Sequence, residues 1–263
     1  MTNDMTRGRI LPQLISFTIP LVLGNLFQLT YNAADSMIVG RYLGGQALAA
    51  VGTAGPIMNL AILFISGMCM GAGILMSTQY GAKQQDVLER QISTTLLSGL
   101  VFSFFVTLSM MVLAKPVLTL IRVPEEILDS ACGYLRIIFT GFLFTFAYNF
   151  FSSTLRALGD SKASLYFLVI SSVFNIAGDL LFVAVFRWGV NGSALATVLS
   201  QMICCLCCMI YIQKKVPLLR LGKRWLIFDK CLLSRTFSFG ITSALQLMCV
   251  QLGKVCVQSM VNM

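Results

Sequence analysis

Residues 10–39 read ILPQLISFTIPLVLGNLFQLTYNAADSMIV, and this stretch decides the fold class. It contains one charged side chain, Asp35, and it is long enough to cross a bilayer, which needs about 20 mostly apolar residues. A backbone in hydrocarbon must satisfy its own polar groups, so the stretch is predicted to be a transmembrane helix. Asp35 then places a charged group inside a membrane-spanning helix, where a charge is energetically unfavourable, so its presence needs an explanation.

The rest of the chain repeats this apolar pattern. Of its 263 residues, 57% are apolar and 11% are charged, and the mean hydropathy is +0.84. Soluble domains carry roughly 25% charged residues, so this composition argues against an ordinary globular protein. The sequence predicts an all-α membrane protein, with further membrane-spanning helices at about 47–79, 92–114, 130–154, 163–186, 193–212 and 236–263.

The residue types and motifs that most enzymes depend on are absent, or lie in apolar segments. The chain has no histidine, which removes the commonest general base and the commonest zinc ligand. Its 9 cysteines are odd in number and lie almost all in apolar segments, which does not predict a disulfide framework. No glycine-rich phosphate loop is present. We therefore expect no enzyme: no catalytic residue, no metal site and no cofactor.

The net charge of +9 sits in short segments between the apolar ones. With the N-terminus in the cytoplasm, 13 basic residues fall in inside segments and 5 in outside segments. This asymmetry follows the positive-inside rule. It predicts a multi-pass protein of the cell (inner) membrane with a cytoplasmic N-terminus, whose surroundings are lipid and not nucleic acid.

The longest connection divides the chain. We predict a six-helix transmembrane lobe at 1–212, a basic cytoplasmic linker at 213–235 and a seventh helix at 236–263. After the linker, residues 238–242 read SFGIT and echo SFTIP at 16–20, where a second bundle would begin. We expect the seventh helix to be the first of a second, missing lobe, and the chain to be the first half of a longer protein.

Of the 10 acidic residues, only Asp35 and Asp179 fall within membrane-spanning segments. Each costs about 2.5–3.5 kcal/mol on insertion scales, so such a residue indicates function. Asp35 precedes Gly40 by five residues and Asp179 precedes Arg187 by eight, which places them about 7 Å and about 12 Å inside the outer helix ends. Both are therefore expected in the outer half of the membrane.

Polar neighbours accompany the first acid. Asn25, Gln28, Asn32 and Asp35 follow steps of three, four and three, so they form one polar stripe that is expected to face the protein interior. Two interpretations of the three amides stay open. They line a polar cavity, or they form hydrogen bonds that hold helices together.

The second acid has matching neighbours. Asn175 precedes Asp179 by four residues and shares its helix face, and Thr197 on the next segment lies about 7–8 Å deep. These hard oxygen donors suit H⁺ or Na⁺. Together with Asp35, they predict a coupling-ion site.

Pro20, in the middle of the first segment, removes a helical hydrogen bond. A hinge and a static bend are both compatible with it. Lys254, in the seventh segment, has no assigned role.

Short motifs along these segments carry a family resemblance. They are Pro20, Gln28 and Asp35 at their spacing, Gly40, Gly44 and Gly45, LAAVG at 48–52, Gly67 and Gly71, STQYGA at 77–82, LRALGDSK at 155–162, Asn175 to Asp179, and GSALAT at 192–197. In this order they make the chain resemble the N-terminal half of a multidrug and toxic compound extrusion (MATE) transporter, over essentially its whole length.

The resemblance implies two six-helix lobes around a central cavity, and secondary active export of cationic and amphipathic drugs in exchange for H⁺ or Na⁺. It implies that Asp35, Asn175, Asp179 and Thr197 form the cation site of the first lobe and that helix one bends at Pro20. Transport then requires the missing C-terminal lobe.

Two alternatives remain at this stage. Flippases of lipid-linked sugars belong to the same superfamily, but their anionic cargo predicts a basic cavity. An intramembrane aspartyl protease would use the two aspartates as a dyad. The sequence does not identify the transported compound or distinguish H⁺ from Na⁺.

Overall fold

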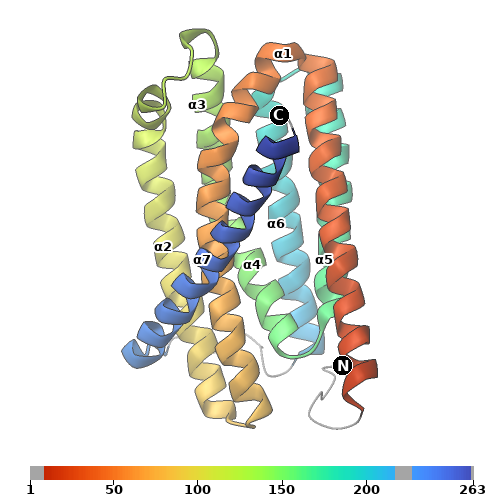
Figure 1. The fold of residues 1–263 in the computed structure, drawn as a ribbon, viewed down its shortest axis with the longest axis vertical. Coiled ribbons are helices and arrows are strands. Elements are labelled where there is room, and N and C mark those ends of the chain that lie inside the picture. Colours follow the sequence, from red (N-terminus) through yellow and green to blue (C-terminus); the bar gives the residue numbers. More distant parts are fainter. Residues whose placement is uncertain (1–8, 217–226, 262–263) are drawn as a thin grey trace.

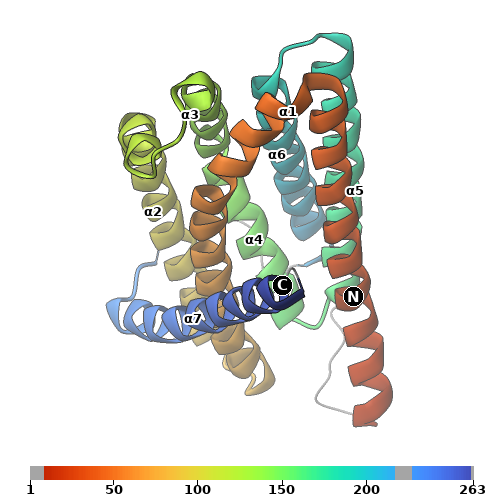
Figure 2. The same cartoon turned by 45° about the horizontal axis from the view of Figure 1, so that its top comes forward.

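The computed structural model describes residues 9–216 and 227–261, and every element within them is helical. This confirms the predicted all-α class. Most of the helices run side by side in one lobe, which α7 crosses obliquely (Figures 1 and 2). The elements are α1 (Ile10–Gly81), α2 (Gln85–Leu120), α3 (Glu125–Thr140), α4 (Phe142–Ala157), α5 (Ser161–Asp179), the π-helix η1 (Leu180–Val185), α6 (Val190–Lys215) and α7 (Lys230–Val261).

By length and composition, four of the described segments can cross a membrane. They are α1, α2, α5 continued by η1, and α6, and the bent pair of α3 and α4 adds a fifth. The helices reach beyond the predicted spans, since α2 and α6 begin earlier and end later than the apolar windows at 92–114 and 193–212. Backbone hydrogen bonding continues past the most apolar residues, so hydropathy alone underestimates helix length.

The helix α1 is a hairpin of two helical halves joined at Gly44. Gly44 has φ 82° and ψ −175°, while the rest of its 72 residues stay helical. The halves run in opposite directions, so the chain folds back on itself (Figure 1). The predicted helix end at Gly40 is wrong, because the first half continues to Gly44. Asp35 therefore lies nine residues from the turn, about 13 Å along the helix axis.

The predicted span at 130–154 is also corrected. It consists of two helices, α3 and α4, which meet at a 47° bend around Gly141. A Cβ at Gly141 would lie 2.6 Å from the side chain of Val198, so glycine lets this bend sit directly against α6. The close fit to α6 is a tertiary contact that the local sequence does not reveal.

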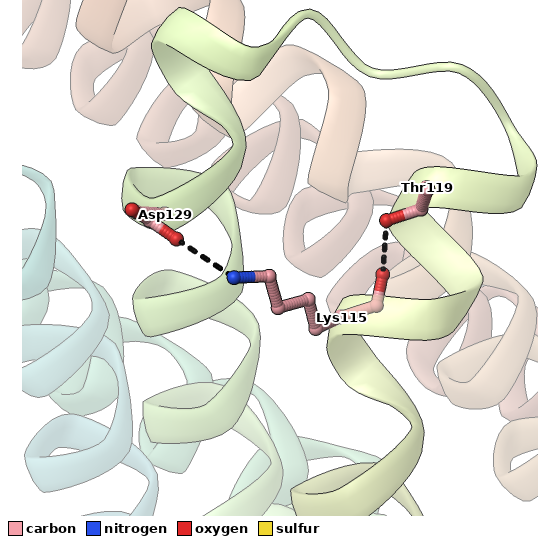
Figure 3. A network of polar contacts seen from close by, with 3 residues as sticks. All are labelled: Lys115, Thr119 and Asp129. Carbon is pink, nitrogen blue, oxygen red and sulfur yellow. Dashed lines mark hydrogen bonds and ion pairs between the residues drawn. The ribbon is translucent and has the colours of Figure 1, made fainter.

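An ion pair joins α2 and α3 near the Gly44 end of the lobe, and Figure 3 shows it. Lys115 Nζ lies 3.6 Å from Asp129 Oδ1, and Thr119 Oγ1 donates to the carbonyl oxygen of Lys115 on the preceding turn. The two charged side chains are 58% and 91% exposed. Exposed pairs of this kind contribute about 0–1 kcal/mol, so packing and not this pair holds the two helices together.

The helix α7 packs against the second half of α1 through small residues. A Cβ at Gly67 would lie 2.5 Å from Ala244, and a Cβ at Gly71 would overlap the backbone at Gly240. Such contacts bring helix backbones close together in membranes. The segment that follows the linker is therefore in contact with the first lobe.

Hydrogen bonds fix the start of this segment to α2. Gln91 Nε2 donates to Thr236 Oγ1 at 2.6 Å, and Ser93 Oγ donates to the carbonyl oxygen of Ile227 at 2.8 Å. The helix begins at Lys230, six residues before the predicted start at 236. Of the predicted linker at 213–235, residues 217–226 lie outside the described part, as does the side chain of Lys254.

The hairpin turn allows a test of whether the backbone conformation at residue 44 requires glycine. The φ and ψ of Gly44 fall in a region that is essentially restricted to glycine, and a Cβ there would meet no atom within 4 Å. We expect Gly44→Ala to lower the free energy of unfolding by about 1–3 kcal/mol through backbone strain alone. Thermal unfolding in detergent measures this. Gly45→Ala is the control, because it also meets no atom and its φ is negative; equal melting temperatures for the two variants would contradict the assignment.

Candidate functional site

Three helices, α1, α5 and α6, bring polar side chains together toward the Gly44 end of the lobe. Asp35 on α1 is half-buried, and Ser193 in the first turn of α6 is completely buried. Ser193 Oγ donates to Asp35 Oδ1 at 3.0 Å. This hydrogen bond ties the first half of α1 to α6 at the predicted acid.

Asp179, the last residue of α5, has no exposed surface. It lies close enough to Asp35 and Ser193 to interact with both. Even so, neither of its carboxylate oxygens has a hydrogen-bond partner among the described residues. A buried carboxylate without a partner is very unfavourable, and a proton or a cation at this position would stabilise it.

Asn175 lies one turn before Asp179 and continues the same buried face. Its Nδ2 donates to Thr197 Oγ1 at 3.2 Å, while its Oδ1 has no partner among the described side chains and backbone groups. The contact depends on close approach of α5 and α6, since a Cβ at Gly178 would lie 2.9 Å from Ala196. Small residues at this crossing therefore place the carboxamide against the hydroxyl.

The structure thus brings all four predicted coupling-ion residues into one region. Asp35, Asn175, Asp179 and Thr197 come from three helices, and three buried oxygens among them have no partner in the described structure. Carboxylate and carboxamide oxygens are hard donors that suit H⁺ or Na⁺. Their role in ion binding stays a prediction. No group of three or more His, Cys, Asp or Glu side chains that could hold a metal ion occurs in the described part of the chain.

The helix changes its form directly after Asp179. Residues Leu180–Val185 form a π-helix, and Phe186 N donates to the Leu181 carbonyl oxygen at 2.9 Å. The ring of Phe182, within this π-helix, stacks on that of Trp188 beyond it, with centroids 5.2 Å apart. Short π-helices occur frequently at functional sites, and the periodicity of the sequence gave no sign of this one.

Three further residues of the site escaped sequence reasoning. They are Ser193, Tyr31 and Tyr134, and Tyr134 is buried on α3 within interaction range of both aspartates and of Tyr31. A signal existed for two of them. Tyr31 precedes Asp35 by four residues and Ser193 precedes Thr197 by four, so each shares a helix face with a predicted residue. Tyr134 lies in another segment, and only the fold brings it to the site.

The three amides of the polar stripe differ from its last member, Asp35, in solvent exposure. Asn25, Gln28 and Asn32 are exposed on α1, whereas Asp35 reaches into the lobe. Exposure in the lobe disfavours the interpretation that these amides hold its helices together. Lining of a polar cavity stays a prediction.

Pro20 is buried and keeps helical φ and ψ, as does every residue of α1 except Gly44. A hinge at Pro20 therefore stays a prediction.

Comparison with known protein families gives a clear match. The family model MatE matches residues 20–181. The chain is 36% identical over 265 residues to the probable multidrug resistance protein YpnP of Bacillus subtilis (strain 168), covering 98% of this chain and 58% of that protein. It is 32% identical over 269 residues to the probable multidrug resistance protein YoeA of the same organism, covering 100% of this chain and again 58% of the relative. The chain therefore spans somewhat more than half the length of these relatives.

Solved structures share the fold. One is described as the outward-facing conformation of a multidrug resistance MATE family transporter of the MOP superfamily, and it matches with a TM-score of 0.88 at 23% identity. A crystal structure of MATE in the straight conformation also matches with a TM-score of 0.88 at 23% identity. Each match covers 97% of this chain and 57% of the other chain.

The link between α5 and α6 can be tested by removing one acceptor. Thr197→Val keeps the side-chain shape but leaves the buried Nδ2 of Asn175 without its partner. We expect the free energy of unfolding to fall by about 0.6–2 kcal/mol, the range for interhelical hydrogen bonds in membranes. Ser200→Ala is the control, because Ser200 Oγ donates only to a carbonyl oxygen of its own helix. A melting temperature for Thr197→Val that is no lower than for Ser200→Ala would argue against the hydrogen bond.

Proposed function

The chain belongs to the MatE family, and on that premise we propose that it forms the ion-binding lobe of a secondary transporter that exports cationic or amphipathic drugs in exchange for H⁺ or Na⁺. The observation that carries this proposal is Asp179. Both oxygens of its buried carboxyl group have no partner among the described residues, and a second carboxyl group, that of Asp35, lies beside it.

Two neighbouring carboxyl groups in a site of low polarity favour capture of a cation. Like charges repel, and burial penalises each charged form, so a proton or a sodium ion stabilises the pair. The Oδ1 of Asn175 and the hydroxyl oxygens of Ser193 and Thr197 supply uncharged donors in the same region. Such a set of hard oxygens is suited to H⁺ or Na⁺ and disfavours soft metals.

Coupling follows from the position of the site on α1. The first half of α1 contacts α5 at Gly24, where a Cβ would lie 3.4 Å from the side chain of Leu168, and it presents exposed amides along its length. Neutralising Asp35 and Asp179 removes the attraction for a cationic drug and lets α1 repack, with Pro20 as the proposed hinge. The ion and the drug then favour different states of the lobe, which is the condition for exchange.

The acidic character of the site favours cationic cargo over the anionic cargo of the flippase alternative. The relatives of this chain are named as probable multidrug resistance proteins, which favours a transporter over an intramembrane protease. Because the chain spans 58% of those relatives, we propose that transport requires a second, C-terminal lobe. The excess of basic residues on one side supports a cell-membrane protein with a cytoplasmic N-terminus.

The proposal predicts loss of export when either acid is neutralised. We would join the chain to the second half of YpnP and express the product in cells loaded with ethidium. We expect ethidium efflux to be driven by an inward gradient of H⁺ or Na⁺. We expect the efflux rate to fall at least about tenfold in Asp35→Asn and in Asp179→Asn, because the negative charge that stabilises the bound ion is gone. Whichever gradient drives efflux identifies the coupling ion.

Asp129→Asn is the matched control, since Asp129 is 91% exposed and lies outside the site. We expect it to export ethidium at the normal rate. Undiminished, gradient-driven efflux in both Asp35→Asn and Asp179→Asn would refute the assignment of the coupling site.

A further inference from the structure

A buried polar face runs along α5 from the proposed ion site to the opposite end of the lobe. Its members follow steps of mostly three and four residues, so they lie on one side of the helix, and each is at most 6% exposed. About 22 Å of helix separates Asp179 from Ser164. The members are Asp179, Asn175, Ser172, Ser171, Ser164 and Ser161.

One apolar turn interrupts this face. Phe167 is buried between Ser164 and Ser171, and its ring contacts that of Tyr211 with centroids 5.5 Å apart. Its carbonyl oxygen accepts a hydrogen bond from Cys204 Sγ at 3.1 Å. A single turn of this kind separates the polar groups near the ion site from those at the N-terminal end of the lobe.

Arg156 closes the face at that end. It lies next to the last residue of α4, and its Nη1 donates to Ser152 Oγ at 2.9 Å and to Ser164 Oγ at 3.2 Å. Tyr148 lies within interaction range of the guanidinium. The positive charge is thus held by one hydroxyl group of α4 and by one on the polar face of α5.

This charge has no carboxylate partner in the described structure, where the one ion pair joins Lys115 and Asp129. The nearest acid along the chain, Asp160, is engaged elsewhere. It accepts from the Tyr211 hydroxyl at 2.7 Å and from the Ala163 backbone N–H at 3.1 Å. A half-buried arginine that hydroxyl groups hold in place without neutralising it acts at a distance as a fixed positive charge.

We propose that Arg156 is an electrostatic barrier that prevents the cation held at Asp35 and Asp179 from crossing the interior of the lobe to its N-terminal end. The inference rests on the proposed function. A fixed arginine charge excludes protons and cations from narrow polar paths in membrane proteins, and the effect is strong where the dielectric constant is low. Without this charge, the single apolar turn at Phe167 would be the remaining obstacle along the face, and ions that cross it would dissipate the gradient without export of a drug.

The test measures ion leak and not transport. The full chain is reconstituted into liposomes, a potassium diffusion potential is applied with valinomycin, and entry of H⁺ and of ²²Na⁺ is followed. We expect ions to enter no faster with the unsubstituted chain or Arg156→Lys than in empty liposomes. With Arg156→Gln we expect ion entry at least about tenfold faster, since this variant removes the charge and keeps a polar side chain.

Lys162→Gln is the matched control, because Lys162 is an exposed cation at the same end, and we expect it not to increase ion entry. A folded Arg156→Gln protein that is as tight as the unsubstituted chain would overturn the proposal, and so would Arg156→Lys leaking as fast as Arg156→Gln.

A second variant covers the case in which Arg156→Gln does not fold. Ser164→Asp places a carboxylate where Ser164 accepts from Arg156, so it neutralises the charge without removing the arginine. It is expected to leak as well, and a tight Ser164→Asp protein would overturn the barrier.

The route of the leak separates this proposal from the proposed function. Adding Asp179→Asn to whichever variant leaks should reduce the leak, because the path begins at that carboxyl group. A leak that is unchanged by Asp179→Asn would refute the path along α5. If ethidium efflux proves independent of Asp35 and Asp179 while the leak still depends on Arg156, the exchange mechanism fails and the barrier stands.

Discussion

A carboxyl group that is removed from water is stable only when its charge is neutralised. This constraint applies at Asp179, and the arrangement of the side chains around it depends on it. The group is completely buried, its oxygens have no partner among the described residues, and Asp35 lies beside it. We propose that a proton or a small cation supplies the missing interaction at this position. Ser193 and Thr197 fix the groups around that position by hydrogen bonds and do not fill it.

Close approach of helices makes this geometry possible. In a bilayer, helix association depends on packing and hydrogen bonds, so small residues at the crossings decide which side chains meet. Gly178 against Ala196 brings α5 to α6 at the site, Gly141 sets the bend of α3 and α4 against α6, and Gly67 and Gly71 seat α7 on α1. Gly44 closes the α1 hairpin with a backbone conformation that other residues rarely adopt.

The charges inside the lobe are separated by sign. The acids lie toward the Gly44 end, Arg156 lies at the N-terminal end, and buried hydroxyl groups on α5 occupy much of the distance between them. Opposite charges placed this way do not neutralise each other, because they are about four turns of helix apart. We propose that the acids act as a site for ions and the arginine as a barrier to them.

The sequence by itself determined the helical membrane class, the approximate spans and the two embedded aspartates, because apolar length and the cost of buried charge can be judged along the chain. It also indicated Asn175 and Thr197, since spacing and depth are local quantities. Only the tertiary structure decided that these groups meet, that Tyr134 and Ser193 join them and that Asn25, Gln28 and Asn32 are exposed. It also decided that the helix turns at Gly44, bends at Gly141 and becomes a π-helix after Asp179. These features depend on how closely separate helices approach, and that distance is set by contacts between residues far apart in the chain.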